Sequence, residues 1–195
     1  MTAAAEITIM LLNTIVSLAI TAFLLRMILQ LVRADFYNPI CQFLVKATNP
    51  LVIPLRKIIP SMGKIDTASV LLALIAQAVG IALLFQLYGG GFPNPAQLLI
   101  WSVIGLCSAL LNLYFFAIIG NIIMSWVAQG GAHPAAQLLY QITEPVMAPF
   151  RKILPPMGGL DLSPIFVFLC IKVLEVILRH GAASAALPRG LIMGL

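Results

Sequence analysis

The chain has 195 residues and a net charge of +5; 62% of its residues are hydrophobic and only 9% are charged. A soluble domain carries roughly 25% charged residues, so this composition excludes an ordinary soluble protein and favours one embedded in a lipid bilayer. The basic residues lie between apolar runs rather than in one patch, which argues against a nucleic-acid partner. The cysteines, Cys41, Cys107 and Cys170, are odd in number and far apart, which argues against a disulfide framework or a cysteine metal cluster.

The first apolar run covers residues 7–32 and is longer than the roughly 20 residues that a bilayer-spanning helix needs. We predict a transmembrane helix here. Arg26 lies one to two turns before the end of this run. We interpret it as a charge whose side chain extends to the membrane interface, with a functional buried charge as the alternative.

The next segment, residues 38–65, changes to an amphipathic pattern. Asn38 and Pro39 are typical of a helix start, and apolar residues then recur at helical spacing. Residues 133–160 repeat this phase after His133 and Pro134, so we interpret His133 as part of a turn or cap rather than as a catalytic base. Both segments are predicted to lie in the membrane interface.

Each of these segments contains the same motif. Residues 48–66 read TNPLVIPLRKIIPSMGKID, and residues 143–161, which start 95 residues later, read TEPVMAPFRKILPPMGGLD. Ten of the 19 aligned positions are identical, which indicates an internal duplication.

Three prolines and one glycine recur in both copies of the motif. The prolines are expected to prevent one continuous helix through the motif, so the apolar backbone between them must lie at the interface or against protein. The glycine allows a tight turn. These residues are Pro50, Pro54, Pro60 and Gly63 in the first copy and Pro145, Pro149, Pro155 and Gly158 in the second.

The motif also repeats an arginine, a lysine and a closing aspartate. The basic side chains are candidates for contact with lipid headgroups, with a carboxylate or with a partner. The aspartates precede the next apolar runs, where a carboxylate can cap a helix, with a salt bridge to the preceding Arg-Lys pair as a further role. The six motif-loop residues are Arg56, Lys57, Asp66, Arg151, Lys152 and Asp161.

Three further spans are predicted, at residues 67–88, 98–127 and 162–178, with an uncharged external turn at 89–97. Lys172 and Glu175 lie three residues apart inside the last span. We interpret them as a self-compensated pair that extends outward, with an ion or proton site as the alternative. The tail, residues 181–195, is rich in small residues and is expected to be poorly ordered.

The distribution of basic residues predicts the orientation. Seven Lys and Arg residues lie in the two motif loops, and two lie beyond the fourth span. The positive-inside rule therefore makes the motif loops cytoplasmic and both termini external. Residues 1–88 and 98–180 then form two repeats of equal orientation, related by an axis along the membrane normal.

The doubled pattern T-x-P-x-x-x-P-x-R-K-I-x-P-x-M-G-x-x-D, followed each time by an apolar span, resembles the YggT family, which includes YlmG-like proteins and a plastid factor for cytochrome b6 haem attachment. The second copy is the more similar, since the first has Ser61 where the second has Pro156 and lacks the Ser163-Pro164 pair. The resemblance implies a small inner-membrane protein of two repeats, linked to osmotic-stress tolerance, cell division and assembly of membrane complexes. It implies no catalytic residue.

Together these patterns predict an all-α membrane protein with four transmembrane helices in two parallel tandem repeats. No catalytic, cofactor-binding or metal-binding constellation is visible in the sequence. We predict a non-enzymatic scaffold, assembly or stress-tolerance factor whose motif loops contact anionic lipids or other membrane proteins, with homo-oligomers expected. The alternative is an oligomeric transport protein for ions or osmolytes.

Overall fold

The computed structural model describes residues 2–127, 133–153, 161–188 and 190–192. These residues form six helices and no strand, with one isolated bridge between Met62 and Ile65. The prediction of an all-α fold is confirmed. The helices are α1 (Ala3–Leu31), α2 (Pro39–Ile58), α3 (Thr67–Leu87), α4 (Pro95–Val127), α5 (Pro134–Ile153) and α6 (Ser163–Ser184).

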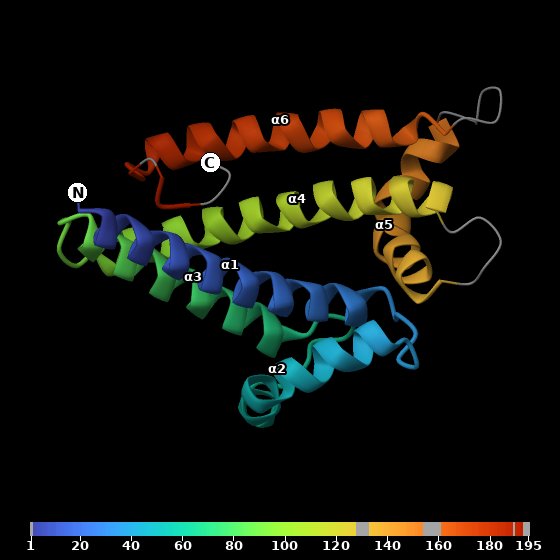
Figure 1. The fold of residues 1–195 in the computed structure, drawn as a ribbon, viewed down its shortest axis with the longest axis horizontal. Coiled ribbons are helices and arrows are strands. Elements are labelled where there is room, and N and C mark those ends of the chain that lie inside the picture. Colours follow the sequence, from blue (N-terminus) through green and yellow to red (C-terminus); the bar gives the residue numbers. More distant parts are fainter. Residues whose placement is uncertain (1, 128–132, 154–160, 189, 193–195) are drawn as a thin grey trace.

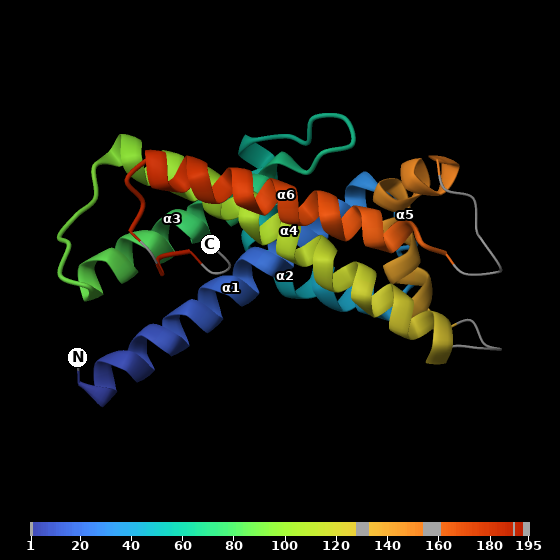
Figure 2. The ribbon, with the colours of Figure 1, turned by 90° about the horizontal axis from the view of Figure 1, so that it is seen from above.

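The helices of the two halves follow the same order and direction (Figures 1 and 2). Helices α1 and α4 run toward the end of the molecule where α2 and α5 begin, and α3 and α6 run in the opposite direction. The N-terminus, the connection between α3 and α4, and the end of α6 lie at the opposite end.

Three helices, α1, α3 and α4, are long and apolar enough to cross a membrane. Helix α6, where the sequence predicts the fourth span, has 22 residues but carries Lys172, Glu175 and Arg179, and it is not among them.

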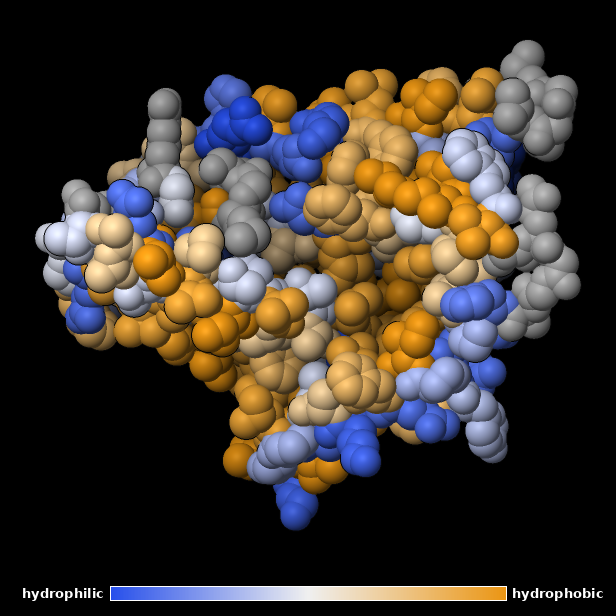
Figure 3. All heavy atoms as spheres, in the orientation of Figure 1, coloured by the Kyte–Doolittle hydropathy of each residue, from blue (hydrophilic) through white to orange (hydrophobic). Residues whose placement is uncertain are grey.

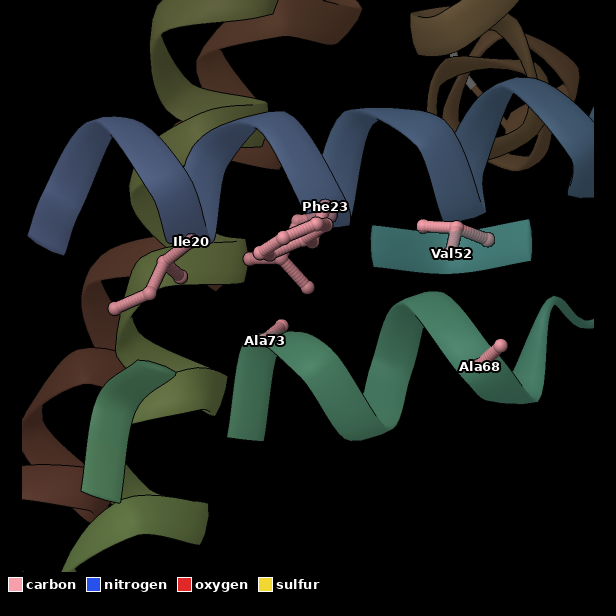
Figure 4. Close-up of a cluster of buried hydrophobic side chains, with 6 residues drawn as sticks. Ile20, Phe23, Val52, Ala68 and Ala73 are labelled. Carbon is pink, nitrogen blue, oxygen red and sulfur yellow. The ribbon is translucent and has the colours of Figure 1, made fainter. Parts of the chain in front are cut away.

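The packing of the first half depends on small residues between α1 and α3. Phe23 of α1 and Val52 of α2 are buried against Ala68 and Ala73 of α3 (Figure 4). At Gly80, an added Cβ would lie 2.6 Å from a methyl group of Val16, so only glycine allows the backbones to approach this closely.

Helices α2 and α5 begin with side-chain caps, as the sequence predicts. The carbonyl oxygen of the Asn38 side chain accepts a hydrogen bond from the backbone N–H of Ile40 at 2.9 Å, and Nδ1 of His133 accepts one from Ala135 at 3.2 Å. The Asn38 side-chain amide also donates to the carbonyl of Pro134 at 2.7 Å, which joins the starts of the two helices.

The expectation that prolines would prevent a continuous helix was wrong for the first two prolines of each copy. Helix α2 runs through Pro50 and Pro54, and α5 runs through Pro145 and Pro149. Each proline removes one backbone donor and displaces the carbonyl four residues earlier. Since the prolines are four residues apart, both defects lie on one helix face, and the helix bends instead of ending; Figure 1 shows α2 changing direction.

The end of the motif behaves as predicted in the first copy. Pro60 follows the end of α2, and Gly63 has a positive φ of 61°, as the tight turn requires. The predictions for Pro155 and Gly158 lie outside the residues that the structure describes.

The expectation of a poorly ordered tail was also wrong for the part that is described. Leu191 packs against Ile9 and Leu84, while Ile192 packs against Ile81 and Trp101. The indole N–H of Trp101 donates a hydrogen bond to the carbonyl of Ala185 at 2.9 Å. The tail covers the ends of α1, α3 and α4, because its apolar side chains find partners on helices that are distant in the sequence.

The Trp101→Phe substitution tests this attachment. It removes the hydrogen bond and leaves the Ala185 carbonyl unsatisfied, so we expect a loss of about 1–2 kcal/mol and faster proteolysis of the tail, measured by mass spectrometry of timed digests. The matched control is Trp126→Phe, at a side chain that is 72% exposed. Equal digestion rates for the two variants would contradict the attachment.

Candidate functional site

The first repeat holds a buried carboxylate, Asp66, at the end of its motif. Asp66 is 0% exposed. Arg56 binds it with two hydrogen bonds, Nη2 to Oδ2 at 2.6 Å and Nε to Oδ1 at 3.2 Å, and the hydroxyl of Ser69 donates to Oδ2 at 2.6 Å. The predicted salt bridge is therefore present. Asp66 precedes α3 at the cap position, but its carboxylate makes no capping hydrogen bond.

Arg26 of α1 adds a second cation to this cluster. Its Nη1 donates to the carbonyl of Val45 at 3.1 Å and to the hydroxyl of Thr48 at 2.5 Å. Its Nε lies 3.6 Å from Oδ2 of Asp66 and has no hydrogen-bond partner. The interpretation of Arg26 as a side chain that extends to the interface was wrong, because it is 5% exposed and enclosed by protein.

Gln30 completes the connection between the three helices. Its Oε1 accepts a hydrogen bond from Nη2 of Arg56 at 2.7 Å. Our sequence reasoning missed Gln30, Thr48 and Ser69 as members of this cluster. The sequence spacing could have predicted Gln30, since Arg26 and Gln30 are four residues apart and therefore share one face of an apolar helix.

The electrostatic balance keeps Asp66 ionised. Burial alone would raise the pKa of this carboxyl, but the hydrogen bonds from Arg56 and Ser69 and the charge of Arg56 hold the pKa below its usual range. A lowered pKa means that the ionised carboxylate stabilises the fold above the unfolded-state pKa of about 4, and that this stabilisation is lost as the pH falls through the folded-state pKa.

The second repeat contains the equivalent pair in a more open form. Nε of Arg151 donates to Oδ2 of Asp161 at 2.9 Å, and Nη1 of Arg151 donates to Glu144. Oδ1 of Asp161 accepts a hydrogen bond from the backbone N–H of Ser163, the first residue of α6, at 2.9 Å, although the residue at the cap position is Leu162. The side chains of Arg151 and Asp161 are 31% and 40% exposed.

The two clusters carry opposite charge. In the first, Arg26 and Arg56 face one carboxylate. In the second, Arg151 faces two. With the 95-residue offset, Arg26 corresponds to Asn121, and Glu144 corresponds to Asn49. The motif has thus been kept in both repeats while its surroundings have changed.

The remaining predicted residues do not join these clusters. Lys57 and Lys152 are exposed and form no ion pair with any described residue. Nζ of Lys172 lies 2.9 Å from Oε2 of Glu175 and 4.9 Å from the centre of the Phe115 ring. Among the described residues, no group of three or more His, Cys, Asp or Glu side chains could hold a metal ion.

The fold and the paired clusters define the class: an all-helical, membrane-type protein with an internal repeat. The model of the family described as CCB3/YggT matches the chain twice, at residues 5–87 and 100–182. The chain belongs to this family.

Several relatives share most of the chain. It is 52% identical to an uncharacterised protein of Pseudomonas aeruginosa over 184 residues, or 92% of each chain. It is 38% identical to the uncharacterised protein YggT of Escherichia coli, over 85% of this chain and 86% of the relative. A chloroplast protein of Arabidopsis thaliana, CCB3, which is named for cofactor assembly of complex C, is 33% identical over 44% of this chain and 48% of its own. No solved structure matches.

The two repeats allow one substitution to be compared in two settings. Asp66→Asn leaves two arginines, one of them buried, without their counter-charge, and breaking a buried pair in this way costs about 3–5 kcal/mol. Asp161→Asn changes an exposed pair worth about 0–1 kcal/mol. We therefore expect thermal unfolding in detergent, followed by circular dichroism, to show a much larger loss for Asp66→Asn. Equal losses would contradict the assignment of Asp66 as the central residue.

Proposed function

We propose that this protein is a non-enzymatic scaffold or assembly factor of the inner membrane, acting through the surface formed by α2 and α5. The observation that carries the proposal is that these two bent, amphipathic helices begin beside one another, where the Asn38 side chain donates to the carbonyl of Pro134 (Figure 1), and that Lys57 and Lys152 are exposed and without a partner among the described residues. Each helix is held by an arginine that is already bound to an aspartate, which leaves the neighbouring lysine available.

In this proposal the chain spans the membrane four times. Helix α6 is the fourth span, in which the ion pair between Lys172 and Glu175 lowers the cost of placing two charges near lipid. The excess of basic residues in the motif loops favours their cytoplasmic placement, with both termini external. The α2–α5 surface then lies at the level of the anionic headgroups, where a lysine contributes about 1 kcal/mol of attraction.

The assembly role is supported by the family. The Arabidopsis relative is named for cofactor assembly, and it matches this chain over 87 residues. An assembly factor needs a surface that holds a client complex rather than a catalytic centre. Exposed apolar residues beside the lysines, Ile58 and Ile153, which are 78% and 74% exposed, offer such a surface.

A double charge reversal, Lys57→Glu with Lys152→Glu, tests the proposal. We expect native gels of membranes from a deletion strain to lack at least one assembled membrane complex, which wild-type protein restores and the double variant does not. The control is Arg179→Glu, a charge reversal at an exposed position near the C-terminal end of α6. A gel pattern unaffected by deletion, or fully restored by the double variant, would contradict the proposal.

A cavity between the repeats favours a second candidate, transport. It has a volume of about 660 Å³ and lies between α1, α3 and α4; Figure 3 shows the molecule hollowed between its two halves. Its lining is mostly apolar but includes the polar residues Asn13, Thr21, Gln77 and Asn112, and polar residues inside a membrane protein often mark a substrate path.

Flux in proteoliposomes separates the two candidates. As a scaffold, the purified protein should move K⁺, Na⁺ and H⁺ no faster than protein-free liposomes do. Flux in the wild type that is lost in the Gln77→Leu and Asn112→Leu variants, but not in Lys172→Met, would instead assign transport through the cavity between the repeats. Flux lost only in Lys172→Met would assign it to the Lys172–Glu175 pair.

A further inference from the structure

We propose that a second pocket, between α1 and α2 in the first repeat, binds the phosphate group of an anionic phospholipid. This pocket has a volume of about 490 Å³. We call it the arginine pocket, because its polar lining consists of three arginines and two amide side chains: Arg26, Gln30, Arg33, Asn49 and Arg56.

The charges around the arginine pocket leave a net positive field. Asp66 is the only carboxylate that forms an ion pair with any of the three arginines among the described residues, and it faces both Arg26 and Arg56. Arg33 has no ion pair in the described part of the chain, and the nearby Asp35 is not in the lining and accepts a hydrogen bond from the backbone of Tyr37 at 2.9 Å. Guanidinium groups bind phosphate strongly because their donors match its oxygens.

The buried charge of Arg26 gives independent support. Arg26 is 5% exposed and its Nε makes no hydrogen bond. A buried cation is costly unless an anion pairs with it. Arg26 and Arg56 share the single carboxylate of Asp66, so an anion in the pocket would add negative charge beside both guanidinium groups. The pocket therefore has a physical reason to be occupied.

The backbone at Arg33 gives a third observation. Arg33 has a positive φ of 53°, in the position after a helix end where glycine is usual. Holding a non-glycine residue there costs roughly 1 kcal/mol. The arginine is thus not explained by the backbone of the turn, whereas a role for its side chain at the mouth of the pocket explains it.

The rest of the lining favours a lipid over free phosphate. Phe36 and Ile53 line the pocket and are 63% and 47% exposed. An arginine-lined wall beside an exposed apolar wall fits an amphiphile, with its phosphate on the arginines and its acyl chain along Phe36 and Ile53. Basic pockets between helices near the membrane surface bind anionic headgroups in this way.

The second repeat does not repeat this arrangement. With the 95-residue offset, Arg26 and Arg33 correspond to Asn121 and Ala128, and Asn49 corresponds to Glu144. Glu144 binds Arg151 directly, so a carboxylate of the chain is bound to the arginine that corresponds to Arg56. We therefore expect one lipid site for each chain.

The Asn49→Glu variant copies the second repeat into the first. It should place a carboxylate against Arg56, as Glu144 does against Arg151, and so exclude phosphate without breaking the fold. Native mass spectrometry of the purified full chain with phosphatidylglycerol should show one tightly bound lipid for the wild type and at least about a tenfold weaker affinity for this variant, which is the effect of losing one charge-assisted contact. The matched control, Asn49→Gln, should bind as the wild type does.

A second variant separates binding from folding. Arg33→Gly removes a cation and relieves the positive φ, so it should weaken phosphatidylglycerol binding while leaving the unfolding temperature equal or higher.

Competition with inorganic phosphate distinguishes a lipid ligand from free phosphate. If millimolar inorganic phosphate does not displace phosphatidylglycerol, the result supports a lipid. Full displacement would overturn the lipid assignment in favour of free phosphate. Equal binding of phosphatidylcholine, or unchanged binding by Asn49→Glu and Arg33→Gly, would overturn the site. Neither Lys57 nor Lys152 lines the pocket, so the double lysine variant should still bind phosphatidylglycerol, and failure of the lipid site can be told apart from failure of the α2–α5 surface.

Discussion

The ionised carboxylate of Asp66 is the constraint on which the first half of the molecule depends. It lies fully buried at the start of α3 and is held by Arg56 from α2, with Arg26 from α1 close by. A charge in this position is tolerated only when it is paired and hydrogen-bonded. Three helices must therefore meet at one point, and this fixes where the bent helix α2 lies against the pair formed by α1 and α3.

Duplication has produced two versions of this arrangement with different consequences. The first is buried and has two cations for one carboxylate, whereas the second is half-exposed and has one cation, Arg151, for two. The shared ion pair positions α2 in the first half and α5 in the second. The surplus positive charge of the first half remains available for an anion, while Glu144 satisfies the corresponding arginine in the second. One motif thus supports two surfaces of different chemistry.

The bends in α2 and α5 connect this ion pair to the proposed surface. Prolines four residues apart turn the helix without ending it, so the start of α2 can meet the start of α5 through Asn38 while its end reaches Asp66 through Arg56. Helices α2 and α5 consequently begin beside one another, α2 lines the arginine pocket, and the cavity between the repeats lies farther along the helices.

The sequence by itself determined the features that depend on neighbouring residues: the duplication, the apolar runs, and the caps at Asn38 and His133. The ion pair between Arg56 and Asp66 could also be predicted from the sequence, since a tight turn brings these two residues together. The tertiary structure alone decided that Arg26 is buried, because its partners lie on α2 and before α3. It also decided that Leu191 and Ile192 are covered. A residue's burial depends on which distant elements fold against it, and no local pattern specifies them.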